Sequence, residues 1–211
     1  MNVLVSIDHQ IDEAAPAMAS EAGHTSKRIV VAYGFWIFLL SDIVMFSALF
    51  AAYAVLARAT AGGLTGAQIF DQASVAIETA CLLASSYTCG LMSLAIGSRR
   101  IGATYLYALL TFALGAAFLA LELREFNHMI AIGANPQRSA FLSAFFALVG
   151  CHGLHVALGL VWLVVMMVQV ALKRLSATVE RRLFCFALFW HALDIIWVWL
   201  FTVVYLMGVK P

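Results

Sequence analysis

The sequence is poor in charged residues, since Asp, Glu, Lys and Arg together make up only 11% of its 211 residues. The two signs nearly cancel, with 12 Lys and Arg against 11 Asp and Glu, and the formal net charge is +1. A chain this balanced offers neither a basic surface for nucleic acid nor an acidic tail for a cationic partner. We therefore expect no nucleic acid among its partners.

Cysteine and proline are also scarce, with four cysteines and three prolines. The cysteines lie inside apolar runs without any C-x-x-C pair, which excludes the common zinc and iron–sulfur spacings and predicts free thiols. Residues 1–29 are polar, contain Pro16 and have no apolar core. This composition argues against a cleavable signal peptide and predicts a flexible N-terminal tail.

Apolar residues are abundant: they make up 64% of the chain and give a mean hydropathy of +0.97. Such a composition suits lipid rather than water. A helix of about 20 apolar residues crosses roughly 30 Å of hydrocarbon, and five runs are long enough. The sequence thus predicts an all-α integral membrane bundle of five transmembrane helices, forming one domain over residues 30–211. The predicted spans are about 31–57, 75–97, 101–121, 139–172 and 183–208.

The charges between these runs predict the connections and the orientation of the chain. A tight turn at 97–102 joins the second and third spans, and residues 122–138 are predicted to form a short amphipathic piece at the membrane interface. If the spans alternate, the positive residues divide eight to four, namely Lys27, Arg28, Arg99, Arg100, Lys173, Arg174, Arg181 and Arg182 against Arg58, Arg124, Arg138 and Lys210. The positive-inside tendency then predicts a cytoplasmic N-terminus and a periplasmic C-terminus.

Ionisable residues inside a membrane span are candidate functional sites, because charge is costly there. Six fall within the predicted spans, namely Asp42, Glu78, His152, His155, His191 and Asp194. Asp42 lies on an apolar stripe and needs a sheltering pocket, since an Asp facing lipid costs ~2.5–3.5 kcal/mol on insertion scales. Glu78 lies near the start of its span, from which its carboxyl is expected to reach the interface.

The histidines admit two interpretations. His152 and His155 share a helix face with Gly159, where a neighbouring helix can pack closely, and His191 precedes Asp194 by three residues. Neighbouring imidazoles on a helix are metal ligands in some bundles. Alternatively, they are neutral packing groups in a histidine–carboxylate network across the fourth and fifth spans. Spacing alone favours packing.

The tryptophans of the fourth and fifth spans also have two interpretations, as a cofactor or quinone box or as core and interface residues. They are Trp162, Trp190, Trp197 and Trp199. Aromatic residues at helical spacing more often fill a core, so we favour packing here too. Small residues of the third span predict a close helix-packing face, formed by Ala113, Gly115, Ala116, Ala117 and Ala120.

Four motifs follow one another along the chain. They are Gly34-Phe35-Trp36-Ile37-Phe38-Leu39-Leu40-Ser41-Asp42, Glu78-Thr79 with Ser85-Ser86, His152-Gly153-Leu154-His155, and Trp190-His191 with Asp194 and Trp197. Together they resemble the haem–copper oxidase subunit III family over residues 33–208. The Asp at the first motif's acid position, usually Glu in cytochrome c oxidases, resembles the quinol-oxidising branch. Five spans are usual in the cytochrome bo type of that branch, whereas many cytochrome c oxidase relatives have seven.

The resemblance implies a non-catalytic subunit of a proton-pumping quinol oxidase, which stabilises the redox subunit and binds lipid in a bacterial cytoplasmic membrane. Haem, copper and quinol then belong to partner subunits, and this chain holds no catalytic, metal-binding or cofactor-binding residue. The implied partners are subunit I, subunit II, a small subunit IV and membrane phospholipids. The candidate residues become structural or contact residues: Asp42, Glu78, His152, His155, Gly159, Trp162, Trp190, His191, Asp194 and Trp197.

Alternative functions remain open at this stage. Within the family, the chain is alternatively the third subunit of a five-span cytochrome c oxidase or an accessory protein of nitric oxide reductase. Outside the family, a self-contained intramembrane metalloenzyme would hold stoichiometric metal in the isolated chain. A small transporter would support flux in liposomes without other subunits.

Overall fold

The computed structural model describes residues 30–31, 33–62 and 72–206 of the chain. It divides into two units, Met1–Asp42 and Ile43–Pro211, and each is described by itself. The N-terminal tail predicted over residues 1–29 lies outside the described residues.

The described residues contain five helices that are long and apolar enough to cross a membrane, which confirms the predicted all-helical fold. They are Tyr33–Leu56, α3 (Gln72–Gly97), α4 (Ile101–Ala131), α5 (Ala140–Lys173) and Ala177–Leu206. The last span consists of α6 (Ala177–Leu200) and a π-helical end, η1 (Phe201–Leu206).

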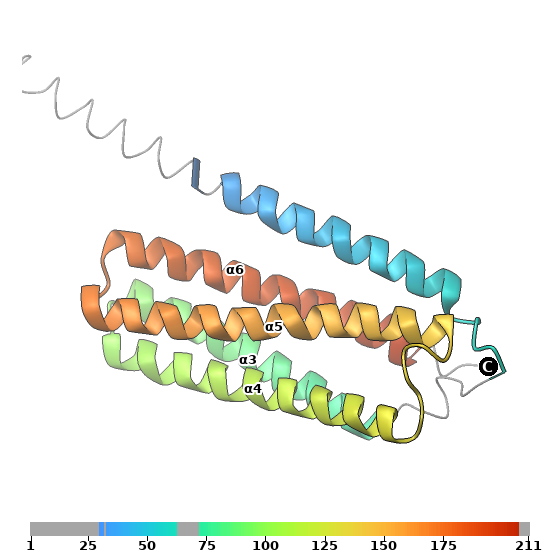
Figure 1. The fold of residues 1–211 in the computed structure, drawn as a ribbon. Coiled ribbons are helices and arrows are strands. Elements are labelled where there is room, and N and C mark those ends of the chain that lie inside the picture. The colour runs from blue at the N-terminus through green and yellow to red at the C-terminus, as the bar shows by residue number, and fades with distance from the viewer. Residues whose placement is uncertain (1–29, 32, 63–71, 207–211) are drawn as a thin grey trace, which may run out of the picture. The chain divides into compact units, whose positions relative to one another are not determined.

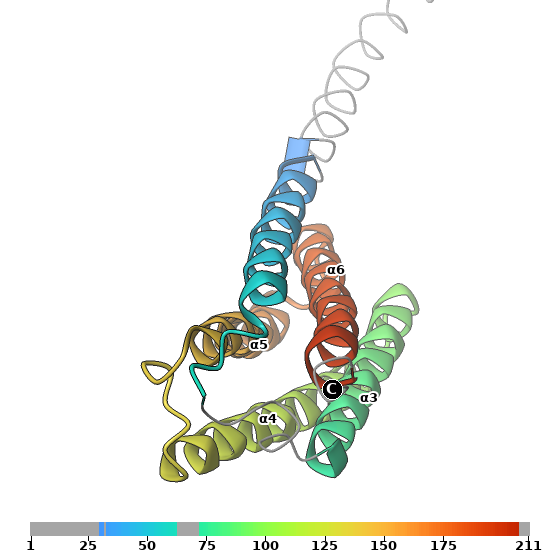
Figure 2. The same ribbon diagram turned by 90° about the vertical axis from the view of Figure 1, so that its right-hand side faces the viewer.

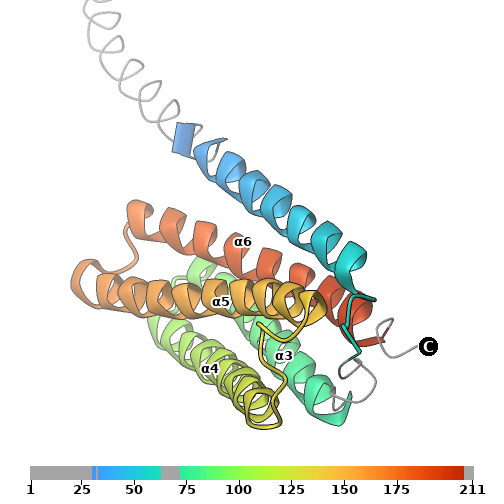
Figure 3. The same ribbon diagram turned by 45° about the vertical axis from the view of Figure 1, so that its right-hand side comes forward.

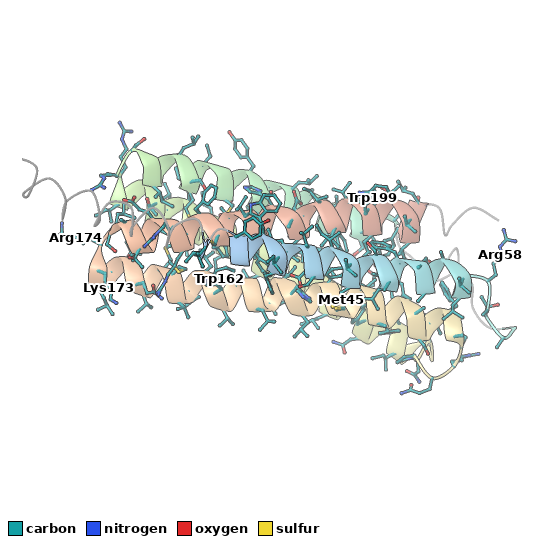
Figure 4. All side chains as sticks on the ribbon, turned by 90° about the horizontal axis from the view of Figure 1, so that it is seen from above. Met45, Arg58, Trp162, Lys173, Arg174 and Trp199 are labelled. Carbon is teal, nitrogen blue, oxygen red and sulfur yellow. The ribbon has the colours of Figure 1, made fainter. Side chains whose placement is uncertain are left out.

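Helices α3 to α6 enclose the core of the second unit. Helix α3 packs on α4 and α6, and α5 packs on the same two helices, so that each helix has two neighbours (Figures 1 and 2). The neighbouring α5 and α6 lie side by side when the bundle is turned by 45° (Figure 3). Arg58 lies at one end of the bundle, whereas Lys173 and Arg174 lie at the other (Figure 4).

The predicted hairpin between the second and third spans is confirmed. Helix α3 ends at Gly97 and α4 begins at Ile101, and the N–H of Arg100 donates to the carbonyl of Ala95 at 3.0 Å. In the turn, the guanidinium of Arg99 forms an ion pair with Glu180 at 3.5 Å. This contact joins the turn to the first residues of α6.

Two helix boundaries differ from the prediction because charged residues do not end the helices. Helix α4 continues to Ala131 through the segment predicted to be a separate interfacial piece, since Glu122 and Met129 face inward while Arg124 faces outward. Helix α6 begins at Ala177 rather than near 183, and its Arg182 points outward to Gln169 at 2.8 Å. In both places the inward face continues without a break.

The small-residue face predicted in the third span is only partly correct. Gly115 is buried in the core, but Ala113, Ala117 and Ala120 are exposed on the outer side of α4. The inward residues of this helix are instead a mixture of small, aromatic and polar side chains, namely Thr104, Ala108, Thr111, Gly115, Phe118, Glu122 and Met129.

Candidate functional site

Two tryptophans of α6 join that helix to α3 in the core. Trp190 and Trp197 are buried, and their indole N–H groups donate to Ser85 Oγ at 2.8 Å and to Thr79 Oγ1 at 3.0 Å. A buried indole needs one such acceptor, so both rings are satisfied within the bundle. Trp199, by contrast, is 63% exposed (Figure 4). The tryptophans therefore do not converge on one cofactor pocket.

Two glycines form the space that Trp190 occupies. A Cβ added at Gly159 of α5 would lie 2.8 Å from Trp190 Cζ3, and one added at Gly115 of α4 would lie 2.9 Å from Cη2. Both distances are shorter than a carbon–carbon contact near 3.5 Å. The sequence predicts a close neighbour at Gly159, and in the structure the indole of Trp190 lies there. Trp162 lies outside this space, with its ring 5.7 Å from that of Phe186.

The paired histidines lie in different environments. His152 is fully buried, and its Nε2 donates to the carbonyl of Leu193 at 3.3 Å, while its ring lies 5.1 Å from that of Trp197. His155 Nδ1 donates to the carbonyl of Cys151 on its own helix at 2.7 Å. The sequence predicts a network of histidines and carboxylates between spans four and five. In the structure, each of these two histidines bonds to a backbone carbonyl instead of a carboxylate. Within the described residues, no group of three or more His, Cys, Asp or Glu is placed to hold a metal.

His191 and Asp194 face α3 rather than α5. His191 Nδ1 lies 2.7 Å from Ser86 Oγ, and Asp194 interacts with both of these residues. The three side chains line a groove of about 500 Å³, which we call the α3/α6 groove. Its other walls are apolar or aromatic, from Leu83, Tyr87, Gly90, Leu91 and Leu94. The groove thus presents a hydroxyl, an imidazole and a carboxyl within an apolar surface.

Two glutamates are buried between α3, α4 and α5. Glu78 is fully buried, so the expectation that its carboxyl reaches the interface is wrong. Glu122 is 3% exposed, and its carboxyl lies against α5, where a Cβ added at Gly153 would meet Oε2 at 2.7 Å. None of their four carboxyl oxygens has a hydrogen-bond partner within the described residues. Sequence reasoning missed Glu122, although its spacing from Gly115 and Phe118 fits the inward face.

Asp42 is the last residue of the first unit and lies on the Tyr33–Leu56 helix. The apolar stripe predicted along this helix continues into the second unit, where Phe46 and Tyr53 are buried. The Phe46 ring lies 5.3 Å from His155, and that of Tyr53 lies 6.1 Å from Phe141. The role of Asp42 stays a prediction.

A second groove, of about 490 Å³, runs between α4 and α5. We call it the α4/α5 groove, and its walls are almost wholly apolar: Tyr105, Ala108, Leu109, Phe112, Leu163, Val164, Met167, Val168 and Ala171. The hydroxyl of Tyr105 donates to the carbonyl of Met167 at 3.0 Å and so joins the two walls. The groove extends toward the end of the bundle that carries Lys173, because Ala171 in its wall is two residues from Lys173, the last residue of α5.

Comparison with known proteins finds similarity over most of the chain. The family model for cytochrome c oxidase subunit III matches residues 6–209. Cytochrome bo(3) ubiquinol oxidase subunit 3 of Pseudomonas aeruginosa is 51% identical over 176 residues, which cover 83% of this chain and 84% of that protein. The same subunit of Pseudomonas putida is 47% identical over 186 residues, covering 88% and 89%. Quinol oxidase subunit 3 of Bacillus subtilis is 41% identical over 175 residues, covering 83% and 86%.

Proposed function

The chain belongs to the cytochrome c oxidase subunit III family, and from this premise we propose that it is the non-catalytic third subunit of a quinol oxidase in a bacterial cytoplasmic membrane. The names of the similar proteins from three bacteria support the quinol branch. In such a complex the oxidation of quinol and the reduction of oxygen to water take place on haem and copper in other subunits. This chain stabilises the subunit that holds them.

The α3/α6 groove is the observation that supports a stabilising role for this chain. His191 and Asp194 lie near the middle of the Ala177–Leu206 span, at the depth where hydrocarbon solvates polar groups worst. A phospholipid headgroup lies at the interface and does not reach this depth. A protein helix does, and one that carries a hydrogen-bond donor would satisfy the carboxyl of Asp194. We therefore assign this groove to the contact with the haem–copper subunit.

Asp194→Leu tests this contact. We expect the haem recovered per tagged chain to fall by roughly tenfold, the change that ~1.4 kcal/mol produces. Asp194→Asn keeps a hydrogen-bonding side chain and should retain more haem. Thr202→Val on the same span is the matched control, because the exposed Thr202 hydroxyl donates to the carbonyl of Val198 on its own helix. Equal haem recovery in the Leu variant and the control would remove the groove from the interface.

The α4/α5 groove has the features of a lipid-binding site. Its apolar walls suit an acyl chain, and the exposed Lys173 and Arg174 lie at the same end of the bundle, within range of an anionic headgroup (Figure 4). We propose that one phospholipid chain occupies it. Mass analysis of the purified complex would detect that lipid, and a fully delipidated complex with unchanged thermal stability would exclude a structural role for it.

The distribution of charge supports the proposed orientation. The end that carries Lys173 and Arg174 also carries Arg99 and Arg181, whereas Arg58 lies at the opposite end (Figure 4). Positive residues favour the cytoplasmic side. We therefore propose a cytoplasmic N-terminus and a periplasmic C-terminus, so that a membrane-impermeant amine reagent added outside intact cells should leave Lys173 unmodified.

Asp42 is proposed to act indirectly, by keeping a polar pocket that hydrates or charges the proton entry path of subunit I. This proposal rests on the position of Asp42 as a single acid at the centre of an apolar stripe in a membrane span. We expect Asp42→Asn to lower the number of protons pumped per electron or to shorten the time over which turnover continues. Proton release and oxygen consumption by the complex in vesicles measure both. If neither changes, Asp42 has no part in proton uptake.

Purification of the tagged chain under mild conditions tests the proposed function as a whole. We expect haem and copper to co-purify together with subunits I and II and a small subunit IV, while the separated chain is colourless. A chain that purifies alone with bound metal would instead identify an intramembrane metalloenzyme. A co-purifying subunit II that carries copper ligands would identify cytochrome c, rather than quinol, as the electron donor.

A further inference from the structure

Glu78 and Glu122 would place an unbalanced charge inside the bundle if they were ionised. Both are buried, and neither pairs with a lysine or arginine within the described residues. An uncompensated ion in such a place costs several kcal/mol even after relaxation. No hydrogen bond or ion pair of the described residues compensates the two carboxyls, so a proton or a bound cation must do so.

Further polar groups surround the two carboxyls. Glu122 interacts electrostatically with Glu78 and with Glu125, which lies one turn further along α4 and is half-buried. Tyr205 of η1 interacts with all three glutamates and also with Tyr53. The hydroxyl of Tyr53 is itself buried without a hydrogen-bond partner in the described residues. Tyr205 thus links the three glutamates to a second buried hydroxyl, that of Tyr53.

A proton fits this site better than a metal ion. A hard cation such as calcium takes six to eight oxygen ligands, and no group of three or more acidic, His or Cys residues in the described part of the chain is placed to start such a set. The Glu122 carboxyl also lies directly against the backbone of α5 at Gly153. A proton needs no additional space, and a neutral carboxylic acid both donates and accepts hydrogen bonds.

The site lies near the Arg58 end of the bundle, with a route toward water. Glu78 is six residues from the first residue of α3, which corresponds to about 9 Å along the helix axis. Glu125 occupies the next turn of α4 beyond Glu122, in the direction of that end, and it is more exposed than Glu122. Glu125 is therefore placed between the buried pair and the aqueous phase.

We propose that Glu78 and Glu122 form a buried proton-holding site: both carboxyls are neutral acids in the assembled protein, and they exchange protons with water through Glu125. Each exchange moves one proton between a carboxyl oxygen and a neighbouring carboxyl or water, without any change of oxidation state. None of its three glutamates lines the α3/α6 groove.

Infrared difference spectroscopy of the whole purified complex tests the proposal, because a protonated carboxyl has a C=O stretching band that a carboxylate lacks. We expect Glu78→Gln and Glu122→Gln each to remove one such band that shifts in heavy water. Glu180→Gln is the matched control and should remove none, since Glu180 is paired with Arg99. Retention of every protonated-carboxyl band in the Glu78 and Glu122 variants would overturn the proposal.

Assembly and exchange provide two further readouts. Glutamine has the shape of a neutral acid, so both variants should assemble with normal haem content, whereas failure of both to assemble would indicate that the carboxyls are ionised and bind a cation. In Glu125→Gln both bands should remain, and their shift in heavy water should slow by roughly tenfold or more, as expected when a general acid–base group is lost. An unchanged exchange rate would exclude the route through Glu125.

Discussion

Trp190→Ala is expected to remove most of the stability of the helix bundle. The indole is 1% exposed, fills the space made by Gly115 and Gly159, and lies with its ring 5.7 Å from Phe186. Truncation of a buried tryptophan to alanine costs roughly 3–5 kcal/mol, which approaches the whole free energy of unfolding of many domains. Little assembled complex should therefore be recovered from membranes that contain the variant.

Two variants separate the contributions of the indole. Trp190→Phe retains a ring but loses the hydrogen bond to Ser85 Oγ, so we expect an intermediate loss of about 1 kcal/mol for that bond, in addition to the smaller volume. Trp199→Ala is the matched control, because Trp199 is on the same helix and is 63% exposed. Haem content after a heating series measures all three. If the two alanine variants are equally stable, Trp190 is not a core residue.

Much of the fold is predictable because few backbone conformations are stable in lipid. Each apolar run has to satisfy its own hydrogen bonds, so a span of sufficient length is a helix. The same reasoning fails at Glu122 and Arg182, where the charges predict the ends of spans. A charged residue ends a helix only if it cannot be accommodated, and Glu122 is accommodated inside the bundle while Arg182 extends outward to Gln169.

The partners of the polar residues were less predictable than their positions. Sequence spacing places Trp190, Trp197 and Asp194 on one stripe of α6, but it does not give the rotation of that helix relative to α3. The acceptors Ser85 and Thr79 lie 105 and 118 residues away along the chain. Hydroxyl residues occur throughout apolar spans and commonly bond their own helix, as Ser93 does to Cys89. Nothing in the sequence distinguishes the two that bind an indole.

The second large loss of stability is expected for Gly159→Val, because Gly159 packs closely against its neighbours. Even the first added carbon would lie 2.8 Å from Trp190 Cζ3 and 3.3 Å from Phe189 Cε1, and valine adds two methyl groups beyond it. The indole is held by its bond to Ser85 and by Gly115 on its other side, so it has little freedom to move away. Overpacking of this kind typically costs about 1–3 kcal/mol, and here we expect the upper part of that range.

Gly102→Val is the matched control for this change, because a Cβ added at Gly102 meets nothing within 4 Å. Both substitutions place the same β-branched residue in a helix, Gly102 near the start of α4 and Gly159 in the interior of α5. We expect the complex with the Gly102 variant to retain its haem on heating and the complex with the Gly159 variant to lose it at a lower temperature.

Combining Gly159→Ala with Trp190→Phe should lower stability by less than the sum of the two single changes, because the smaller ring makes room for the added carbon. Additive losses would mean that the glycine and the indole do not compete for the same space.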